Sequence, residues 1–540
     1  MVNEDLQREG WRPYLVLGIA VLAVGLVSWR PFPAGVWHDD GVYMMVAKAL
    51  AEGHGFTYQG VVGAPPAVKF PPVYPAFLGG LWALFGSIGP VTLVATLANV
   101  LFLALAGVLL ARAVRLSTGA PLGIALGAGG LAVVSGDVLR TSSAVLSEPL
   151  FLAMVGGCLL LWPSAVDPGV TSRETTRARI ALAALLVLLI GTRAAGMAFV
   201  VAFGVAMALR AGVRSGLWVA GPALAGWFGW SAWAGRRGRA VPEHLSDLLG
   251  PYSGWMREQA LADPGAFVAR LPGHVVGVLE RVAVLLLPRV EGVLLWAAAL
   301  PLFALAVYGA VYAVRRFPPL AWSALAYAGL LFAWPYLDRR LVVPLHLLVV
   351  ALLGIGAYRL ISSIGPGRRA SVVATLFAAW VGFYGFVGAH RIAVGWPTAA
   401  YEIRAERLAG AVEAMGRTVP SDAVVGAPEF WSALYLHGGW TVAPSGLFTP
   451  AVTDADAPVW GTPEEQEHLW LETGVEYLLL EQGGTMHGAT LDRLEARCPG
   501  MVRVVARMSP MLLVHLDRSG AIPAPEGSRQ TFRFSCPSES

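Results

Sequence analysis

Residues 91–111 read VTLVATLANVLFLALAGVLLA, a run of 21 residues without a charged side chain. A helix needs about 20 apolar residues to cross the hydrocarbon core of a bilayer, so this run predicts a membrane-spanning helix. The whole chain of 540 residues has the same character, with 56% hydrophobic residues, 14% charged residues and a mean hydropathy of +0.61. Soluble domains carry roughly 25% charged residues. The composition therefore excludes a soluble enzyme, a disordered chain and a fibrous repeat, and predicts a polytopic membrane protein.

Similar apolar runs predict about eleven spans, which we place at 13–30, 91–111, 119–135, 147–162, 180–192, 194–209, 216–233, 290–314, 319–337, 341–361 and 371–389. Arginines gather at alternate connections, for example at Arg112 and Arg315. The positive-inside rule assigns such connections to the cytoplasm. The N-terminus is therefore expected on the cytoplasmic side of the cytoplasmic membrane, and the region after residue 389 on the outer side. The first run lacks a small-residue cleavage site, so it is expected to stay as a span.

Two segments depart from a simple span. Residues 71–86 are apolar but short and begin with two prolines, so we expect an interfacial or re-entrant helix there. Residues 180–192 and 194–209 are expected to form a broken pair that turns at Thr192 and Arg193. No internal repeat of the kind found in pseudo-symmetric transporters is visible.

The predicted fold class is mainly α, with a helical membrane bundle over residues 1–389 and a small extracytoplasmic α/β domain over residues 390–540. Its elements are an amphipathic helix at about 398–416 and strand-like runs at 423–425, 477–480 and 511–516. The extramembrane loops on the same side are placed at 31–70, 135–147 and 234–289. Cys498 and Cys536 both fall in the last domain, where a disulfide between them is plausible, whereas Cys158 lies in an apolar run and is expected in the core.

The loop at 31–70 contains the adjacent aspartates Asp39 and Asp40, just after the first predicted span. Charged residues in such a place are costly unless they are solvated or used. Asp40 has a structural role available, as the N-cap of a helix that starts near Gly41. Asp39 has none and is the stronger functional candidate. Tyr43 follows Asp39 by four residues and is expected on the same helical face.

Other charged residues accompany the aspartates. Lys69 precedes Pro71-Pro72 and is either a snorkelling interfacial lysine or a cation for a ligand. Glu148 follows Ser147 at the start of an apolar run, which suits either the first turn of a helix or a carboxylate that faces Asp39. The remaining candidates for ligand binding on this side are Tyr74, Arg140, Arg193, Arg339 and Arg340. Arginines between apolar runs usually pair with anions, and lipid headgroups are an alternative partner for them.

Carboxylates and cations at the outer edge of a helical bundle suit a ligand with an apolar tail and a phosphate. Glycosyl transfer from a lipid-linked phosphosugar fits, because Asp39 can deprotonate an acceptor hydroxyl and Lys69 with the arginines can stabilise the leaving phosphate. A phosphate departs without a general acid, so a single displacement would invert the anomeric carbon. The net charge of +4 is scattered among apolar runs, and no nucleic-acid interface is expected.

Three stretches carry a resemblance to a known family: DDGVYMMVAKALAEGHG at 39–55, KFPPVYP at 69–75 and SEPLF at 147–151. They resemble the GT-C superfamily of membrane glycosyltransferases, and more narrowly the group of protein O-mannosyltransferases and lipid A aminoarabinose transferases. The resemblance implies a polyprenyl-phosphate sugar donor, Asp39 as the base, Lys69 as the donor-phosphate lysine and Glu148 as the second-loop carboxylate. Asp40 stands where the family more often has glutamate, so the base is either Asp39 or Asp40. The acceptor, whether glycan, lipid or protein, is left open.

Several alternatives remain. No cofactor is required by this chemistry, although a divalent Mg²⁺ or Mn²⁺ that bridges Asp39 and Glu148 is left open by their oxygen ligands. A membrane transporter would place its ionisable residues near the middle of the bilayer, whereas these gather at one edge. A polysaccharide polymerase or ligase, or an inactive relative that binds the lipid phosphate, would use the same donor.

Overall fold

Each of the eleven apolar runs forms a helix in the computed structural model. These helices are α2 (Arg12–Ser28), α5 (Ile88–Thr118), α6 (Leu122–Val133), α8 (Glu148–Val166), α9 (Ser172–Thr192), α10 (Gly196–Ala211), α11 (Val213–Arg237), α15 (Gly292–Arg316), α16 (Pro318–Ala333), α17 (Val343–Ile364) and α18 (Arg368–Ala393). Four of them (α5, α8, α9, α15), and α17 together with the turn before it, are long and apolar enough to cross a membrane. The membrane-protein prediction is supported, whereas the predicted count of about eleven spans is not confirmed.

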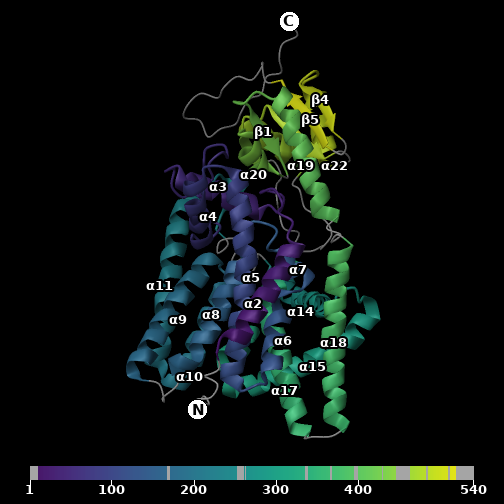
Figure 1. Cartoon of the computed structure of the whole chain (residues 1–540). Coiled ribbons are helices and arrows are strands. Elements are labelled where there is room, and N and C mark those ends of the chain that lie inside the picture. Colours follow the sequence, from purple (N-terminus) through teal and green to yellow (C-terminus); the bar gives the residue numbers. More distant parts are fainter. Residues whose placement is uncertain are drawn as a thin grey trace.

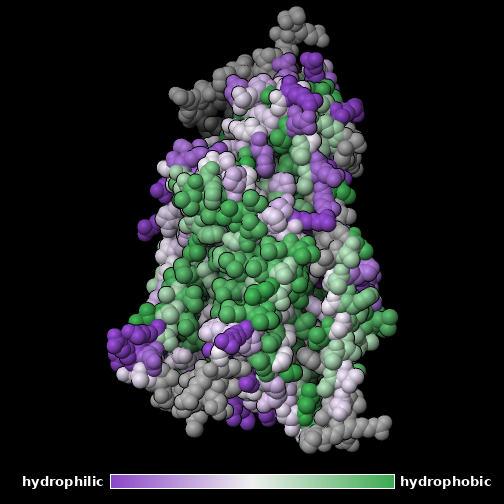
Figure 2. All heavy atoms as spheres, in the orientation of Figure 1, coloured by the Kyte–Doolittle hydropathy of each residue, from purple (hydrophilic) through white to green (hydrophobic). Residues whose placement is uncertain are grey.

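The structure describes residues 10–166, 171–251, 261, 263–334, 338–364, 368–394, 399–428, 430–444, 462–481, 485–508 and 511–517. In Figure 1 the helices form a bundle, and a small α/β domain lies at the end opposite the N-terminus. We call the two ends of the bundle the domain end and the N-terminal end. Figure 2 shows a hydrophobic band around the middle of the visible face, with hydrophilic residues towards both ends. This band is the surface expected of a protein that lies in a bilayer.

Arginines gather at the N-terminal end, as their spacing predicted. The Arg112 guanidinium lies 3.9 Å from the centre of the Trp11 ring. Arg210, near the end of α10, donates a hydrogen bond to the carbonyl of Arg315, near the end of α15. Two further arginine-bearing connections therefore meet at this end. Leu15 and Leu209, by contrast, are exposed at 57% and 70% and face outward from the bundle. Cys158 is a free, buried cysteine in the bundle core, as expected.

Two helices of the bundle differ from their predicted extent. The segment expected at 180–192 is part of α9, which begins at Ser172 because the Thr171 side chain caps it by accepting from Glu174 N. The predicted loop at 234–289 contains the helix α14 (Pro264–Leu286), whose last turns are buried in the bundle core. The loop also holds the short η1 (Gly238–Ala240), η2 (Glu243–Leu245) and α12 (Ser246–Leu249). Its proline-rich, partly polar sequence obscured the helical period of α14.

The α/β domain contains a five-stranded sheet in the order β2-β1-β3-β5-β4. Its strands are β1 (Val424–Ala427), β2 (Thr441–Pro444), β3 (Tyr477–Glu481), β4 (Val502–Met508) and β5 (Met511–Leu516), and its helices are α19 (Ala399–Thr418), α20 (Trp431–Ala433), η4 (Leu434–Gly438), α21 (Pro463–Glu472) and α22 (Thr485–Arg497). Strand β1 is parallel to β2 and β3, whereas β5 is antiparallel to β3 and β4. Three strands and α19 were predicted. Cys498 is buried after α22, and its predicted partner Cys536 lies outside the described residues.

The loop at 31–70 packs directly against this domain. It forms α3 (Asp39–Ala51), and α4 (Val73–Phe85) follows it, short as predicted. Val62 N donates to Val442 O at 3.0 Å and Val442 N donates to Gly60 O at 2.7 Å, so the loop extends the sheet beside β2. The Lys48 ammonium lies 4.5 Å from the centre of the Tyr435 ring. The loop and the domain therefore share one hydrophobic core.

Candidate active site

The turn before α3 sets the direction of the aspartates. His38 has a positive φ of 67° with ψ of −67°, and a positive φ is uncommon for a residue other than glycine. Helix α3 begins at Asp39, two residues earlier than predicted. The prediction that Asp40 is the N-cap is therefore wrong, because Asp40 lies within the first helical turn.

Asp40 nevertheless stabilises this turn. Its Oδ1 accepts hydrogen bonds from Trp37 N at 3.0 Å and Gly41 N at 2.8 Å, and the side chain is fully buried. Burial raises the pKa of Asp40 to about 7, although these backbone hydrogen bonds oppose the rise. The Asp40 carboxyl thus stabilises this turn by accepting hydrogen bonds from its backbone.

Asp39 lies beside Arg340, with 3.3 Å between its Oδ2 and the guanidinium Nη1. Arg340 belongs to η3 (Arg339–Val342), in the connection between α16 and α17. Its Nε donates a hydrogen bond to Asp338 Oδ2 at 3.0 Å. The Asp39 side chain keeps 25% of its surface exposed. Burial by itself would raise the pKa of Asp39 and is the largest single effect, but the surrounding positive charges, with Arg340 foremost, together outweigh it and hold the pKa below its usual value. Asp39 is ionised at neutral pH and can accept a proton.

Glu148 makes the second ion pair. Its Oε1 lies 2.9 Å from Nη1 of Arg193, which occupies the turn between α9 and α10. The same nitrogen donates to Ser147 Oγ at 2.9 Å, and the Tyr43 hydroxyl lies 3.3 Å from that Oγ. The Glu148 side chain is only 1% exposed. Its Oε2 is buried and has no hydrogen-bond partner in the described part of the chain.

The two ion pairs belong to one electrostatic cluster. Arg193 acts on the charge of Asp39 as well as on that of Glu148, and Arg340 likewise interacts with both carboxylates. Tyr43 also interacts electrostatically with both carboxylates, Asp39 and Glu148. Lys69 is half-buried, donates from Nζ to Leu248 O at 2.7 Å, and contributes to the field at Asp39. Segments far apart in the sequence therefore meet at the domain end of the bundle.

Aromatic rings pack against Tyr43, next to this cluster. The centre of the Tyr43 ring lies 4.7 Å from that of Phe70 and 5.1 Å from that of Tyr74. Tyr74 is fully buried and also interacts electrostatically with Glu148 and Asp40. The Arg340 guanidinium lies 5.6 Å from the centre of the Trp37 ring.

Arg140 and Arg339 take part in a neighbouring group instead. Both face Asp137, with Arg140 Nη1 at 3.6 Å from Oδ1 and Arg339 Nη1 at 3.9 Å from Oδ2. Arg140 belongs to α7 (Gly136–Arg140), and Arg339 is adjacent to Arg340 but 61% exposed. Six of the ten predicted site residues come together in the structure: Asp39, Tyr43, Lys69, Glu148, Arg193 and Arg340. Asp40 hydrogen-bonds the backbone of the turn, and the Tyr74 ring packs against Tyr43.

Residues that the sequence did not single out complete the site. The His38 ring lies 5.6 Å from the ring of Trp431, at an interplanar angle of 73°. Trp431 belongs to α20 of the α/β domain and is 1% exposed. Burial lowers the pKa of His38 to about 4, so its imidazole is neutral at physiological pH. No motif in the C-terminal sequence signals this contact, because it depends on how the domain packs on the loop.

Within the described ranges, no three His, Cys, Asp or Glu side chains gather in a way that could hold a metal ion. Asp39 and Glu148 each face a guanidinium group instead.

No protein-family model and no curated protein matches this sequence. Solved structures do match. The structure of ArnT from Cupriavidus metallidurans bound to undecaprenyl phosphate aligns with a TM-score of 0.56 at 14% identity, over 95% of this chain and 98% of that chain. The archaeal oligosaccharyltransferase AglB from Archaeoglobus fulgidus, in complex with an inhibitory peptide and a dolichol-phosphate, aligns with a TM-score of 0.50 at 13% identity, over 87% of this chain and 69% of that chain. This chain therefore shares the fold of ArnT and AglB, which are GT-C glycosyltransferases.

Proposed function

We propose that this protein transfers a sugar from a polyprenyl-phosphate donor to an acceptor hydroxyl, with inversion at the anomeric carbon. The observation that carries the proposal is the cluster of two carboxylates and two arginines at the domain end of a bundle with this fold. The undecaprenyl phosphate bound to the structural neighbour supports a lipid-linked donor. We also place this end of the bundle on the outer side of the cytoplasmic membrane and the N-terminus inside, on the arginine distribution.

Asp39 acts as the base in this proposal. The acceptor oxygen attacks the anomeric carbon while the Asp39 carboxylate takes its proton, and the bond between that carbon and the phosphate oxygen breaks. The electron pair of the broken bond leaves with the polyprenyl phosphate, which needs no proton at neutral pH. Asp39 suits this role because it is ionised and a quarter of its side chain is exposed.

The cations stabilise the leaving phosphate. Arg340 and Arg193 present planar guanidinium groups, which match phosphate oxygens in a bidentate manner. Lys69 adds a third positive charge near Asp39. Arg340 pairs with Asp39 and Arg193 with Glu148, and the donor phosphate would take over part of this pairing. The resulting stabilisation of developing charge is the main source of catalysis expected in such a site.

A divalent metal has no step in this mechanism. Each carboxylate faces a guanidinium group, so a cation placed between Asp39 and Glu148 would meet the positive charges of Arg340 and Arg193.

Asp39→Asn tests the proposal. Asp338 still pairs with Arg340 after this change, so the site should remain folded. We expect transfer to fall roughly 10²- to 10⁴-fold, while binding of the polyprenyl-phosphate sugar, measured by native mass spectrometry, is retained. Asp137→Asn is the matched control, because Asp137 is a carboxylate at the same end that pairs with other arginines. Near-normal transfer by Asp39→Asn would eliminate Asp39 as the base.

A further inference from the structure

The chain reverses direction at His38, immediately before the proposed base. Asp39 N donates a hydrogen bond to Trp37 O at 2.9 Å, and His38 between them has φ of 67° and ψ of −67°. These features define a γ-turn of the rare form that is strained for residues other than glycine. Such strain persists only where the surrounding structure holds the backbone in place. Neighbouring residues must therefore hold this turn, which we call the His38 turn (residues 37–39).

The His38 turn presents two side chains to one cation. Asp39 Oδ2 lies 3.3 Å from Arg340 Nη1, and the centre of the Trp37 ring lies 5.6 Å from the Arg340 guanidinium. Burial raises the pKa of Asp39, and Arg340 is foremost among the charges that lower it. A change of backbone conformation at His38 would move Trp37 and Asp39 together. It would therefore disturb the pairing that keeps Asp39 ionised.

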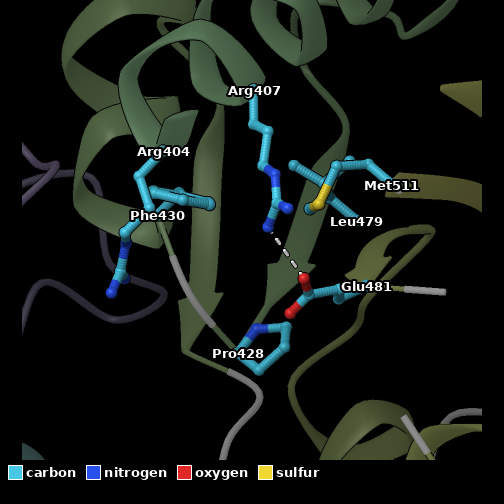
Figure 3. A pocket seen from close by; sticks show the side chains of 7 residues that line it. All are labelled: Arg404, Arg407, Pro428, Phe430, Leu479, Glu481 and Met511. Carbon is cyan, nitrogen blue, oxygen red and sulfur yellow. Dashed lines mark hydrogen bonds and ion pairs between the residues drawn. The ribbon is translucent and has the colours of Figure 1, made fainter. Parts of the chain in front are cut away.

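The ring of His38 packs on the α/β domain. It lies 5.6 Å from the Trp431 ring at an interplanar angle of 73°, an edge-to-face arrangement that stabilises aromatic pairs. Trp431 is 1% exposed, and Phe430 before it also has a positive φ, of 60°. Arg404 lies 5.2 Å from the centre of the Phe430 ring, and Figure 3 shows it extending from α19 beside that ring. Helix α19 thus supports the segment that carries Trp431.

The loop and the domain also approach closely on either side of this aromatic pair. A Cβ added at Gly41 would overlap the Ser432 hydroxyl, so α3 and α20 are in direct contact there. The His437 ring of η4 donates from Nε2 to Ala34 O at 3.0 Å, because a carbonyl oxygen can only accept. These contacts fix the position of α20 relative to the His38 turn.

We propose that the α/β domain maintains the geometry of the active site, with Trp431 as a positioning residue that holds the His38 turn and keeps Asp39 against Arg340. The inference rests on the proposed transfer reaction and gives the C-terminal domain a task in it. Trp431 acts through His38 and not on the substrates. Without its ring, the turn relaxes to an unstrained conformation and the Asp39 carboxylate moves away from Arg340.

Hydrogen exchange of the full-length protein, followed by mass spectrometry, tests this contact without any substrate. Peptides that cover residues 36–44 contain the Asp39 amide, which is hydrogen-bonded within the turn. Trp431→Leu should increase exchange there by roughly two- to tenfold, the range expected for loss of an aromatic pair. Trp470→Leu is the matched control, because Trp470 is an equally buried tryptophan of the same domain in a separate hydrophobic cluster. If both variants change exchange at residues 36–44 equally, the proposal is overturned.

Substitutions at His38 keep the proposal falsifiable if Trp431→Leu does not fold. Glycine adopts a positive φ without strain, so His38→Gly can form the turn without help from Trp431. Alanine must bear the strain and has no ring for Trp431 to hold. His38→Gly should therefore retain roughly tenfold more transfer activity than His38→Ala. Equal activity of the two variants would show that the strained turn has no bearing on Asp39.

The pH–rate profile separates positioning from a simple loss of folded protein. The rate is measured as consumption of an undecaprenyl-phosphate sugar donor. Because Arg340 lowers the pKa of Asp39, a relaxed turn raises that pKa, and the acidic limb of kcat/KM moves to higher pH in Trp431→Leu. Trp470→Leu should lower the rate equally at every pH and leave the limb in place. An unmoved limb in a folded Trp431→Leu variant overturns the proposal.

The two readouts also distinguish this inference from the transfer reaction. A wild type that consumes donor, with neither exchange nor the acidic limb altered by Trp431→Leu, refutes the role of Trp431 alone. A wild type that consumes no donor refutes the transfer reaction; faster exchange at residues 36–44 in Trp431→Leu, but not in Trp470→Leu, then still supports the hold of Trp431 on the turn.

Discussion

Replacing Asp40 by asparagine should stabilise the protein at alkaline pH and leave transfer intact. Asp40 is fully buried, and its pKa rises from 3.8 to about 7 on folding. A pKa that is higher in the folded state contributes stability that is complete below the unfolded pKa and is lost as pH rises through the folded pKa. Asparagine carries no charge and keeps the oxygen that accepts from Trp37 and Gly41.

The magnitude follows from the two pKa values. Each tenfold difference in acidity corresponds to about 1.4 kcal/mol, so ionised Asp40 at pH 8 costs up to about 4 kcal/mol. About half of that amount should be lost between pH 5.5 and pH 8, since the ionisation continues up to the folded pKa. The wild type should therefore unfold at a distinctly lower temperature at pH 8 than at pH 5.5, and Asp40→Asn should reduce this difference.

The assay is thermal unfolding in detergent, followed by intrinsic tryptophan fluorescence at both pH values, together with sugar transfer at pH 7. Asp40→Asn should be at least as stable as the wild type at pH 8 and should transfer sugar at a comparable rate. Two results would refute the reasoning. A variant that is less stable at pH 8 would show that the ionised carboxylate is needed by the backbone, and a folded variant without transfer activity would move the role of base from Asp39 to Asp40.

Four further outcomes are expected. Arg193→Met should destabilise the protein by about 3–5 kcal/mol, because it leaves Glu148 buried without its partner; the double variant with Glu148→Gln should recover most of this loss in thermal unfolding. Arg340→Gln should move the acidic limb of the pH–rate profile to higher pH, since the charge that depresses the pKa of Asp39 is removed; an unmoved limb would contradict the assignment of Asp39 as the titrating base. Gly41→Ala should cost about 1–3 kcal/mol by overpacking, because its Cβ would lie 2.2 Å from the Ser432 hydroxyl, and an unchanged unfolding temperature would argue against the close packing of loop and domain. Chelation by EDTA should leave initial rates of transfer unchanged, and a loss that Mg²⁺ or Mn²⁺ restores would require a metal in the mechanism.

The sequence predicted the helices of the bundle well, because an apolar run of about 20 residues has few alternatives in a membrane. It was less informative for the α/β domain. Strand β2 is short and ends at Pro444, a residue that argues against a strand, and β4 carries Arg503 and Arg507 among its apolar residues. Helix α14 was missed because the sequence around it resembles a polar loop.

Part of the site could be predicted from the sequence. Asp39, Glu148 and Arg193 stand out because charge is rare near apolar runs. The pairing of Asp39 with Arg340, some 300 residues apart, follows only from the packing of η3 against the first loop. The contact of His38 with Trp431 depends on the α/β domain, whose sequence has no matching motif.

The hydrogen bonds between the loop and β2 bear on how the chain assembles. Val62 and Val442 are about 380 residues apart, yet each donates to the other's segment. Ribosomes add roughly 5–20 residues per second, so the loop emerges roughly 20 to 80 seconds before the strand that it will join. During that interval the edge of the loop that pairs with β2, and the part of α3 that packs on α20 and η4, have no partner. A quality-control chaperone or a holding lipid surface would be needed then, and truncations near the C-terminus should be degraded rather than accumulate as a stable bundle.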